Sequence, residues 1–104
     1  MNNSLIVNLY PVPNGETDER LTVSSSVVSL TGAWTASKTK YVLVDIQGAD
    51  VMVTFDGSDP SSTNGHLFKK LADPFFWHRD TARVAKFIRS ASTDASVHVT
   101  PFNV

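Results

Sequence analysis

Apolar and polar residues alternate along two stretches in the middle of the chain, residues 41–47 and residues 50–55. Side chains of an extended strand point alternately to its two faces, so each stretch collects its apolar positions on one face. These positions are Val42, Val44 and Ile46 in the first stretch, and Val51, Val53 and Phe55 in the second. Because a short connection containing Gly48 joins the stretches, the pattern predicts that they pair as a hairpin.

Shorter runs of β-branched and aromatic residues fill the rest of the chain and are separated by turn residues. Strands are predicted at residues 5–10, 66–71, 74–78 and 95–100, and residues 20–24 and 27–30 form two strands or one bent strand. Residues 80–89 are ambiguous, because Val84, Phe87 and Ile88 also fit helical spacing. The preferred prediction there is one helical turn at 80–82 followed by a strand at 84–89. Pro11 and Pro13 are predicted to end the first strand and Pro101 the last, since proline cannot donate to a strand ladder. Thr93 and Asp94 are predicted to form a tight turn before the final strand.

Short strands divided by frequent turns are typical of an all-β protein. About eight such strands are enough for two packed sheets, and we predict an antiparallel β-sandwich of jelly-roll or Greek-key type. A length of 104 residues fits a single domain. Within residues 1–104, the proline-broken stretch 1–15 is a candidate extended N-terminal arm.

The composition narrows the classes of function. Nine Lys+Arg oppose ten Asp+Glu, for a formal net charge of −1, and the cations form no stripe. Nucleic-acid binding needs clustered cations, so we do not expect it. We expect no membrane association, because no apolar run approaches the roughly 20 residues of a membrane-spanning helix. The first residues also lack the features of an export signal. The absence of cysteine excludes disulfides and cysteine-ligated zinc, which leaves partner chains as a source of added stability.

Side chains that could carry chemistry are present but do not form catalytic patterns. The loop at residues 56–65 places Asp, Ser, Thr and Asn oxygens together, which suits an ion or a sugar, although its dipeptides are also those of ordinary turns. His66, His78 and His98 lack metal-ligand spacing, and His98 is predicted to face away from the core. No serine lies in a nucleophile elbow. We therefore predict a protein that is not an enzyme and uses no cofactor or metal.

The run Phe75-Phe76-Trp77 is the feature most suggestive of function. Neighbouring side chains of a strand point to opposite faces, so three consecutive aromatic residues cannot all enter one core if the segment is extended. At least one is predicted to face the surface or a partner, and a loop that folds all three inward is the alternative. An N-terminal arm that reaches a neighbouring subunit is a second candidate contact. The candidate interface residues are Tyr10, Pro11, Pro13, Phe75, Phe76 and Trp77.

Residues 51–102 resemble small structural proteins of tailed bacteriophages. The resemblance is carried by VTFDGSDP at 53–60, NGH at 64–66, AKFIR at 85–89, TDA at 93–95 and VHV at 97–99. It implies a jelly-roll sandwich that decorates or cements a capsid shell. The implied partners are the major capsid protein or other virion subunits, and the implied state is a homo-oligomer, either a dimer or a trimer. Tail and head-to-tail connector proteins contain similar sandwiches.

Three classes of function remain. The first is a virion structural protein, made in the host cytoplasm, that acts through protein–protein contacts and forms a symmetric oligomer. The second is a carbohydrate-binding module with Trp34 or Trp77 as the stacking platform, which predicts a monomer with an exposed tryptophan. The third is a small cupin-like metal enzyme, which the spacing of the histidines disfavours.

Overall fold

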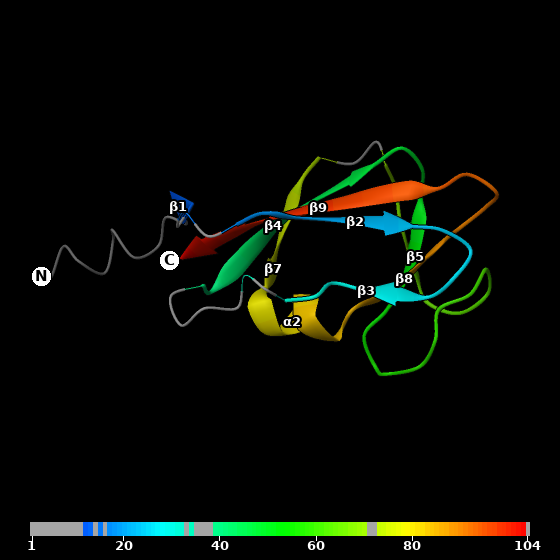
Figure 1. Ribbon diagram of the computed structural model, residues 1–104. Helices are drawn as coiled ribbons and strands as arrows, with labels where there is room; N and C mark the ends of the chain where they lie inside the picture. The colour runs from blue at the N-terminus through cyan, green and yellow to red at the C-terminus, as the bar shows by residue number, and fades with distance from the viewer. Residues whose placement is uncertain are drawn as a thin grey trace, which may run out of the picture.

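The structure is a computed structural model that describes residues 12–13, 15, 17–32, 34, 39–70 and 73–103. Its strands lie in two antiparallel sheets that face each other (Figure 1). No helix among these residues is long and apolar enough to cross a membrane. The elements are β1 (Val12–Pro13), β2 (Glu19–Val23), β3 (Val28–Ser29), β4 (Tyr41–Gln47), β5 (Val51–Thr54), β6 (His66–Phe68), β7 (Phe75–His78), α2 (Arg79–Val84), β8 (Lys86–Arg89) and β9 (Ala95–Asn103).

The order of the strands is that of a jelly roll. Sheet A has the order β1-β9-β4-β7, with β2 also paired to β9, and sheet B has the order β3-β8-β5-β6. Strands of the first half pair in reverse order with those of the second: β2 with β9, β3 with β8, β4 with β7 and β5 with β6. The chain is therefore one long antiparallel hairpin, rolled so that β4 also pairs with β9 and β5 with β8. This topology confirms the predicted all-β sandwich.

The predicted central hairpin is wrong. Strands β4 and β5 lie where the alternation places them, but β4 belongs to sheet A and β5 to sheet B. The chain passes from one sheet to the other through Gly48, whose φ is +84°. Each strand still buries its valines, because the inner faces of both sheets meet in the same core. The alternation of apolar and polar residues shows which face of a strand is buried. It does not show whether two successive strands pair as a hairpin or lie in different sheets.

The local hairpin of sheet B instead joins β5 to β6 across the polar loop 55–65. Gly65 closes this loop with a φ of +122°, where a Cβ would lie 2.8 Å from the carbonyl oxygen of Val53. That approach is closer than a side chain tolerates, so glycine is required at this position.

The elements after β7 differ from the prediction in their bounds. The helical turn predicted at 80–82 is the helix Arg79–Val84, and the next strand begins at Lys86 rather than at residue 84. His78 caps the helix, since its Nδ1 accepts a hydrogen bond of 3.1 Å from the backbone N–H of Asp80. The connection 90–94 crosses from sheet B to sheet A and is not a tight hairpin turn.

Two prolines lie within strands, contrary to the prediction. Strand β9 continues through Pro101 to Asn103. Because β2 pairs with β9 as far as Val99 and β1 pairs from Phe102, Pro101 has a described partner only on β4. Proline fits there because one edge of the strand carries no described ladder at that point. Pro13 likewise belongs to β1, a strand of two residues at the edge of sheet A.

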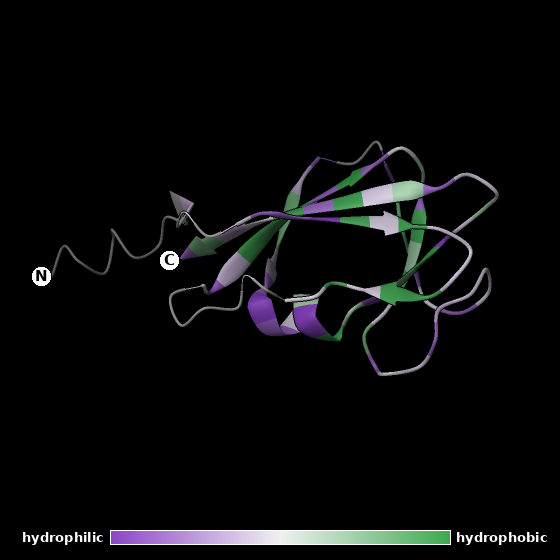
Figure 2. Ribbon diagram, in the orientation of Figure 1, coloured by the Kyte–Doolittle hydropathy of each residue, from purple (hydrophilic) through white to green (hydrophobic). Residues whose placement is uncertain are grey.

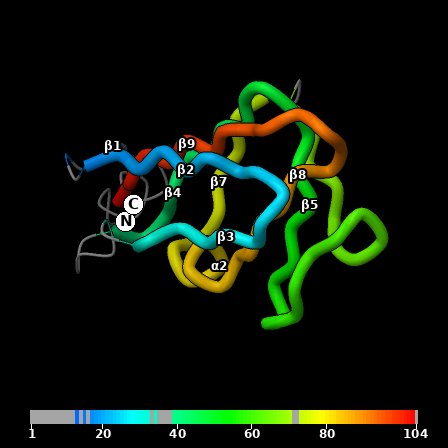
Figure 3. The backbone as a smooth tube through the Cα atoms, turned by 45° about the vertical axis from the view of Figure 1, so that its right-hand side comes forward, coloured from blue at the N-terminus to red at the C-terminus, as the bar shows by residue number. Residues whose placement is uncertain are grey.

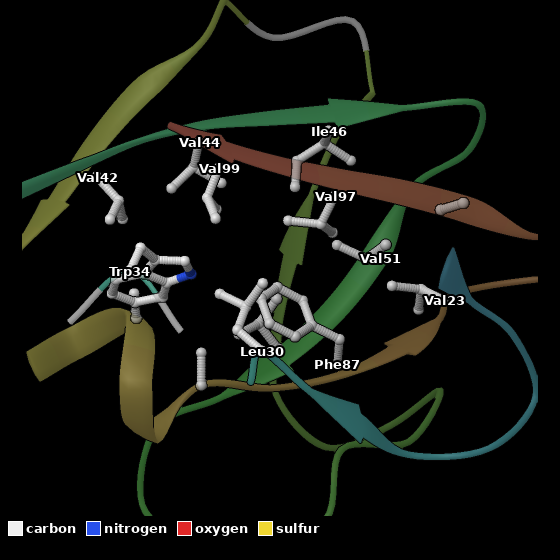
Figure 4. Packing of buried hydrophobic residues seen from close by; sticks show 14 residues of the cluster. Val23, Leu30, Trp34, Val42, Val44, Ile46, Val51, Phe87, Val97 and Val99 are labelled. Atoms are coloured by element: carbon white, nitrogen blue, oxygen red, sulfur yellow. The ribbon is translucent and has the colours of Figure 1, made fainter. Parts of the chain in front are cut away.

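The core fills the space between the sheets. Valines of β4 and β9 point toward Leu30, Trp34 and Phe87 (Figure 4), and apolar and polar residues alternate along β9 (Figure 2). Glu19 fixes the buried indole, because its carboxylate accepts hydrogen bonds of 2.8 Å from Nε1 of Trp34 and 2.7 Å from the backbone N–H of Thr31. One carboxylate therefore ties strand β2 to the segment that follows β3.

Candidate functional site

The outer face of sheet A has an apolar end. Cross-strand register aligns Leu43 of β4 with Phe76 of β7, and Tyr41 of β4 with Phe102 of β9. These residues alternate with buried ones such as Val42 and therefore share the outer face. We call Tyr41, Leu43, Phe76 and Phe102 the aromatic patch.

Ring contacts hold the aromatic patch together. Phe76 and Phe102 meet edge to face with their centroids 5.1 Å apart, although β4 lies between their strands. Tyr41 meets the ring of His78 at 5.6 Å and 85°. Phe76 nevertheless exposes 46% of its surface. Edge-to-face contacts restrict the rings, so the patch is a preorganised apolar surface.

Charged residues flank the aromatic patch where β7 ends. Asp80 Oδ2 lies 3.7 Å from Nδ1 of His78, whose ring contacts Tyr41. Asp80 lies just after β7, within 3.8 Å of Arg79 and 3.6 Å of Arg83. An apolar centre with charged residues at its margin is the usual anatomy of a protein–protein interface.

Strand β7 separates the three aromatic residues that the sequence singled out. Phe76 faces outward, whereas Phe75 and Trp77 are half-buried and pack against the core. The Trp77 ring lies 5.4 Å from Phe55 and 5.6 Å from Phe68. The prediction that at least one of the three faces the surface is confirmed. The alternative of a loop that folds all three inward is wrong, because the segment is a strand.

The remaining candidate interface residues lie toward the N-terminus. Pro13 is exposed and pairs with Phe102, at the margin of the aromatic patch. Tyr10 and Pro11 fall outside the described residues. Sequence reasoning missed Phe102, because Pro101 was predicted to end β9. It also missed Tyr41 and Leu43, which occupy outward positions of an alternating strand, where polar residues are usual.

The other end of this outer face is polar. Arg20 donates to Oε1 of Gln47, Oγ of Ser96 and Nδ1 of His98, each at 3.2 Å. Since a guanidinium can only donate, Nδ1 of His98 accepts, and its Nε2–H donates to Asp18 at 3.1 Å. His98 therefore faces away from the core, as predicted. These polar groups are already paired with one another, whereas the aromatic patch offers apolar surface.

The polar loop between β5 and β6 projects away from the body of the domain (Figure 3) and is organised by its own side chains. Asp56 Oδ1 accepts hydrogen bonds from the Ser58 hydroxyl at 2.5 Å and from the Ser58 N–H at 3.0 Å. These two hydrogen bonds hold the pKa of the Asp56 carboxyl below its ordinary value of 3.8, and the bond from the hydroxyl has the larger effect. These contacts are those of a local turn.

We expect Ser58→Ala to raise the pKa of Asp56 toward 3.8, because the variant loses the stronger of the two hydrogen bonds to the carboxylate. A depressed pKa means that this bond stabilises the folded protein at pH above about 4, and that the contribution is lost as pH falls through the folded pKa. An NMR titration of the Asp56 carboxyl measures the shift. Ser62→Ala, an exposed serine of the same loop, is the matched control and should leave the titration unchanged. Equal pKa values for Ser58→Ala and the native chain would contradict the assignment.

The side chains on which the alternative functions depended do not converge. Within the described ranges, no three His, Cys, Asp or Glu side chains form a group that could hold a metal. Trp34 is 1% exposed, and Trp77 packs on the inner side of sheet A. An open pocket of about 420 Å³ beside the polar loop is instead lined by Thr54, Phe55, Asp56, Asn64, Gly65 and His66. Neither tryptophan therefore provides a stacking platform at the loop.

Comparison with known proteins returns no relative: no family model, no curated protein and no solved structure matches this chain.

Proposed function

We propose that this protein is a non-enzymatic structural subunit that binds further copies of itself through the aromatic patch. The observation that supports the proposal is Phe76, which is 46% exposed within an uncharged group of aromatic and aliphatic side chains. Removing such a surface from water is favourable by about 25 cal/mol per Å². The patch is held in place by three paired strands, and the same patch on two copies can form a symmetric contact.

The particle to which such an oligomer would belong is inferred from the sequence. Residues 51–102 resemble bacteriophage structural proteins, and viral capsid domains are among the proteins that use the jelly roll. Lectins and cupins use it too, so the fold does not select among these functions. We propose that the oligomer decorates or cements a bacteriophage capsid shell. A tail or connector protein is the alternative within the same class.

The first test is the association of Phe76→Ser. Removing one interfacial phenyl ring forfeits about 1.5–3 kcal/mol of apolar burial. The dissociation constant should therefore rise roughly 10- to 100-fold. Light scattering across a dilution series measures the mass of the native chain and of the variant. We expect a native dimer or trimer that persists on dilution, and a variant that dissociates at higher concentration.

Val84→Ser is the matched control. Val84 is 51% exposed and lies at the end of α2, outside the aromatic patch. Its loss removes exposed apolar surface without touching sheet A, so the mass profile should match that of the native chain. A native chain that is monomeric at every concentration, or equal effects of the two variants, would contradict the proposed contact.

A further inference from the structure

Strand β7 leaves one edge of sheet A open. Among the described strands it pairs only with β4. The backbone N–H of Arg79 donates to the carbonyl of Lys40 at 2.9 Å, and this bond sets the alternation of the antiparallel ladder. By that alternation Phe75 and Trp77 bond to β4, while the N–H and C=O groups of Phe76 and His78 point away from it. The carbonyl of His78 belongs to the N-cap of α2 and accepts the first hydrogen bond of that helix. The open edge therefore offers an added strand two backbone donors, the N–H groups of Phe76 and His78, and one acceptor, the C=O of Phe76.

Within its own four residues the edge of β7 carries no lysine or proline; Pro74 directly precedes the strand and Arg79 directly follows it. Edge strands are normally shielded by lysines, prolines or very short length. At the edges of sheet B, β6 runs directly into Lys69 and Lys70, and β3 has only two residues. Strand β7 has the sequence FFWH, without an acidic or basic residue other than its histidine. It is the apolar edge of the sandwich.

The N-terminal segment has the sequence of a suitable strand. Residues 5–10 read LIVNLY, and residues 1–15 contain no charged side chain. With a period of two, Leu5, Val7 and Leu9 share one apolar face. Paired with β7, this apolar face would extend the core side of sheet A beside the half-buried Phe75 and Trp77. The opposite face of the segment would lie on the outer side of the sheet, beside Phe76. The chain offers no other uncharged apolar run outside its described strands.

The segment is too short to reach this edge within its own chain. Strand β1 lies at the opposite side of sheet A, and its first residue is Val12. A strand added beyond β7 lies four strand spacings from β1, about 19 Å. Tyr10 is two residues from Val12 and reaches at most about 7 Å, and Val7 reaches about 17 Å. Residues 7–10 therefore cannot lie along β7 of the same molecule.

We propose that residues 5–10 of a second copy of this chain pair with the open edge of β7 and extend sheet A by one strand. This inference rests on the proposed function and deepens it by naming the partner and its segment. The added strand is held by backbone hydrogen bonds to Phe76 and His78, and by burial of its apolar face at the edge of the core. Each copy both donates and accepts an arm, which gives a symmetric exchange.

Cysteine cross-linking tests the exchange directly, because the native chain contains no cysteine. Asn8→Cys carries one thiol in the arm, and His78→Cys in a copy of different mass carries one at the edge of β7. The two are mixed at a concentration where the native chain is oligomeric and treated with a short bis-maleimide. We expect a covalent mixed dimer on a denaturing gel. The matched control replaces His78→Cys by Thr22→Cys, an exposed position of β2 next to β9, and should give little product.

Two outcomes would overturn the inference. Equal yields with Thr22→Cys and His78→Cys would show random collision. Conversion of the double variant Asn8→Cys/His78→Cys into an internally linked monomer would show that the arm folds back on its own chain. Either result leaves the aromatic patch untouched, because the mass of Phe76→Ser is measured separately. Failure of the arm exchange and failure of the proposed function are therefore distinguishable.

Discussion

Phe87→Ala is expected to lower the free energy of unfolding by about 3–5 kcal/mol. Phe87 is completely buried and lies in β8, paired with Val53 on one side and Val28 on the other. Its ring is 6.1 Å from that of Trp77, so the variant leaves a cavity between the two sheets. A small domain has about 5–15 kcal/mol of stability in total, so the loss would bring the variant close to unfolding. Urea denaturation followed by tryptophan fluorescence measures it.

Phe76→Ala removes the same atoms from the outer face of sheet A and is the control for Phe87→Ala. Its side chain is 46% exposed, and its truncation forfeits chiefly the ring contact with Phe102, about 0.5–1.5 kcal/mol. The urea denaturation of both variants should be measured at protein concentrations too low for self-association. Equal losses of stability would contradict the placement of Phe87 in the core and Phe76 on the surface.

Glu19→Ala is expected to cost about 3 kcal/mol of stability, an unusually large effect for a partly exposed carboxylate. The substitution leaves Nε1 of the buried Trp34 without its acceptor, and an unsatisfied buried donor costs about 1–3 kcal/mol. It also removes the charge-assisted bond to the N–H of Thr31, and bonds of this kind contribute about 1.5–3 kcal/mol. The midpoint of urea denaturation, followed by tryptophan fluorescence, measures the effect.

Two variants separate the role of Glu19 as an acceptor from its charge. Glu19→Gln keeps one oxygen acceptor and should recover part of the lost stability. Asp18→Ala removes the neighbouring carboxylate, whose side chain is 46% exposed and which contacts His98, and exposed ion pairs contribute about 0–1 kcal/mol. If Asp18→Ala were as destabilising as Glu19→Ala, the indole contact would not be what anchors the loop after β3.

Sequence reasoning was most successful where the signal is local. The polar loop at 56–65 and the turn at Gly48 are visible as runs of glycine, aspartate, asparagine and serine, whose turn preferences come from their own backbone and side chains. The helix after β7 was underestimated, because its capping group is His78, a side chain that forms a cap only through the bond to Asp80. The prediction for Pro101 was wrong for a related reason. A proline destabilises a strand only where an adjacent strand needs its missing N–H, and that depends on the strand pairing.

The aromatic patch shows where local reasoning stops. Phe76 could be assigned to the surface because alternation allows only every second residue of β7 into the core. Phe102 and Leu43 could not be joined to it, because their distance in the sequence says nothing about register between β9, β4 and β7. That register places an aromatic ring of the chain's last strand 5.1 Å from one in β7.

The all-β fold class follows from the sequence: its alternation produces short strands with one buried face, and its turn residues separate them. The sequence also shows that at least one residue of Phe75-Phe76-Trp77 must leave the core. Which strands are neighbours emerged from the tertiary structure, which places β4 and β5 in different sheets and pairs β7, among the described strands, with β4 alone. The physical reason is that a period of two specifies the face of each side chain. The partner of a strand depends on hydrogen bonds and packing between segments far apart in the chain.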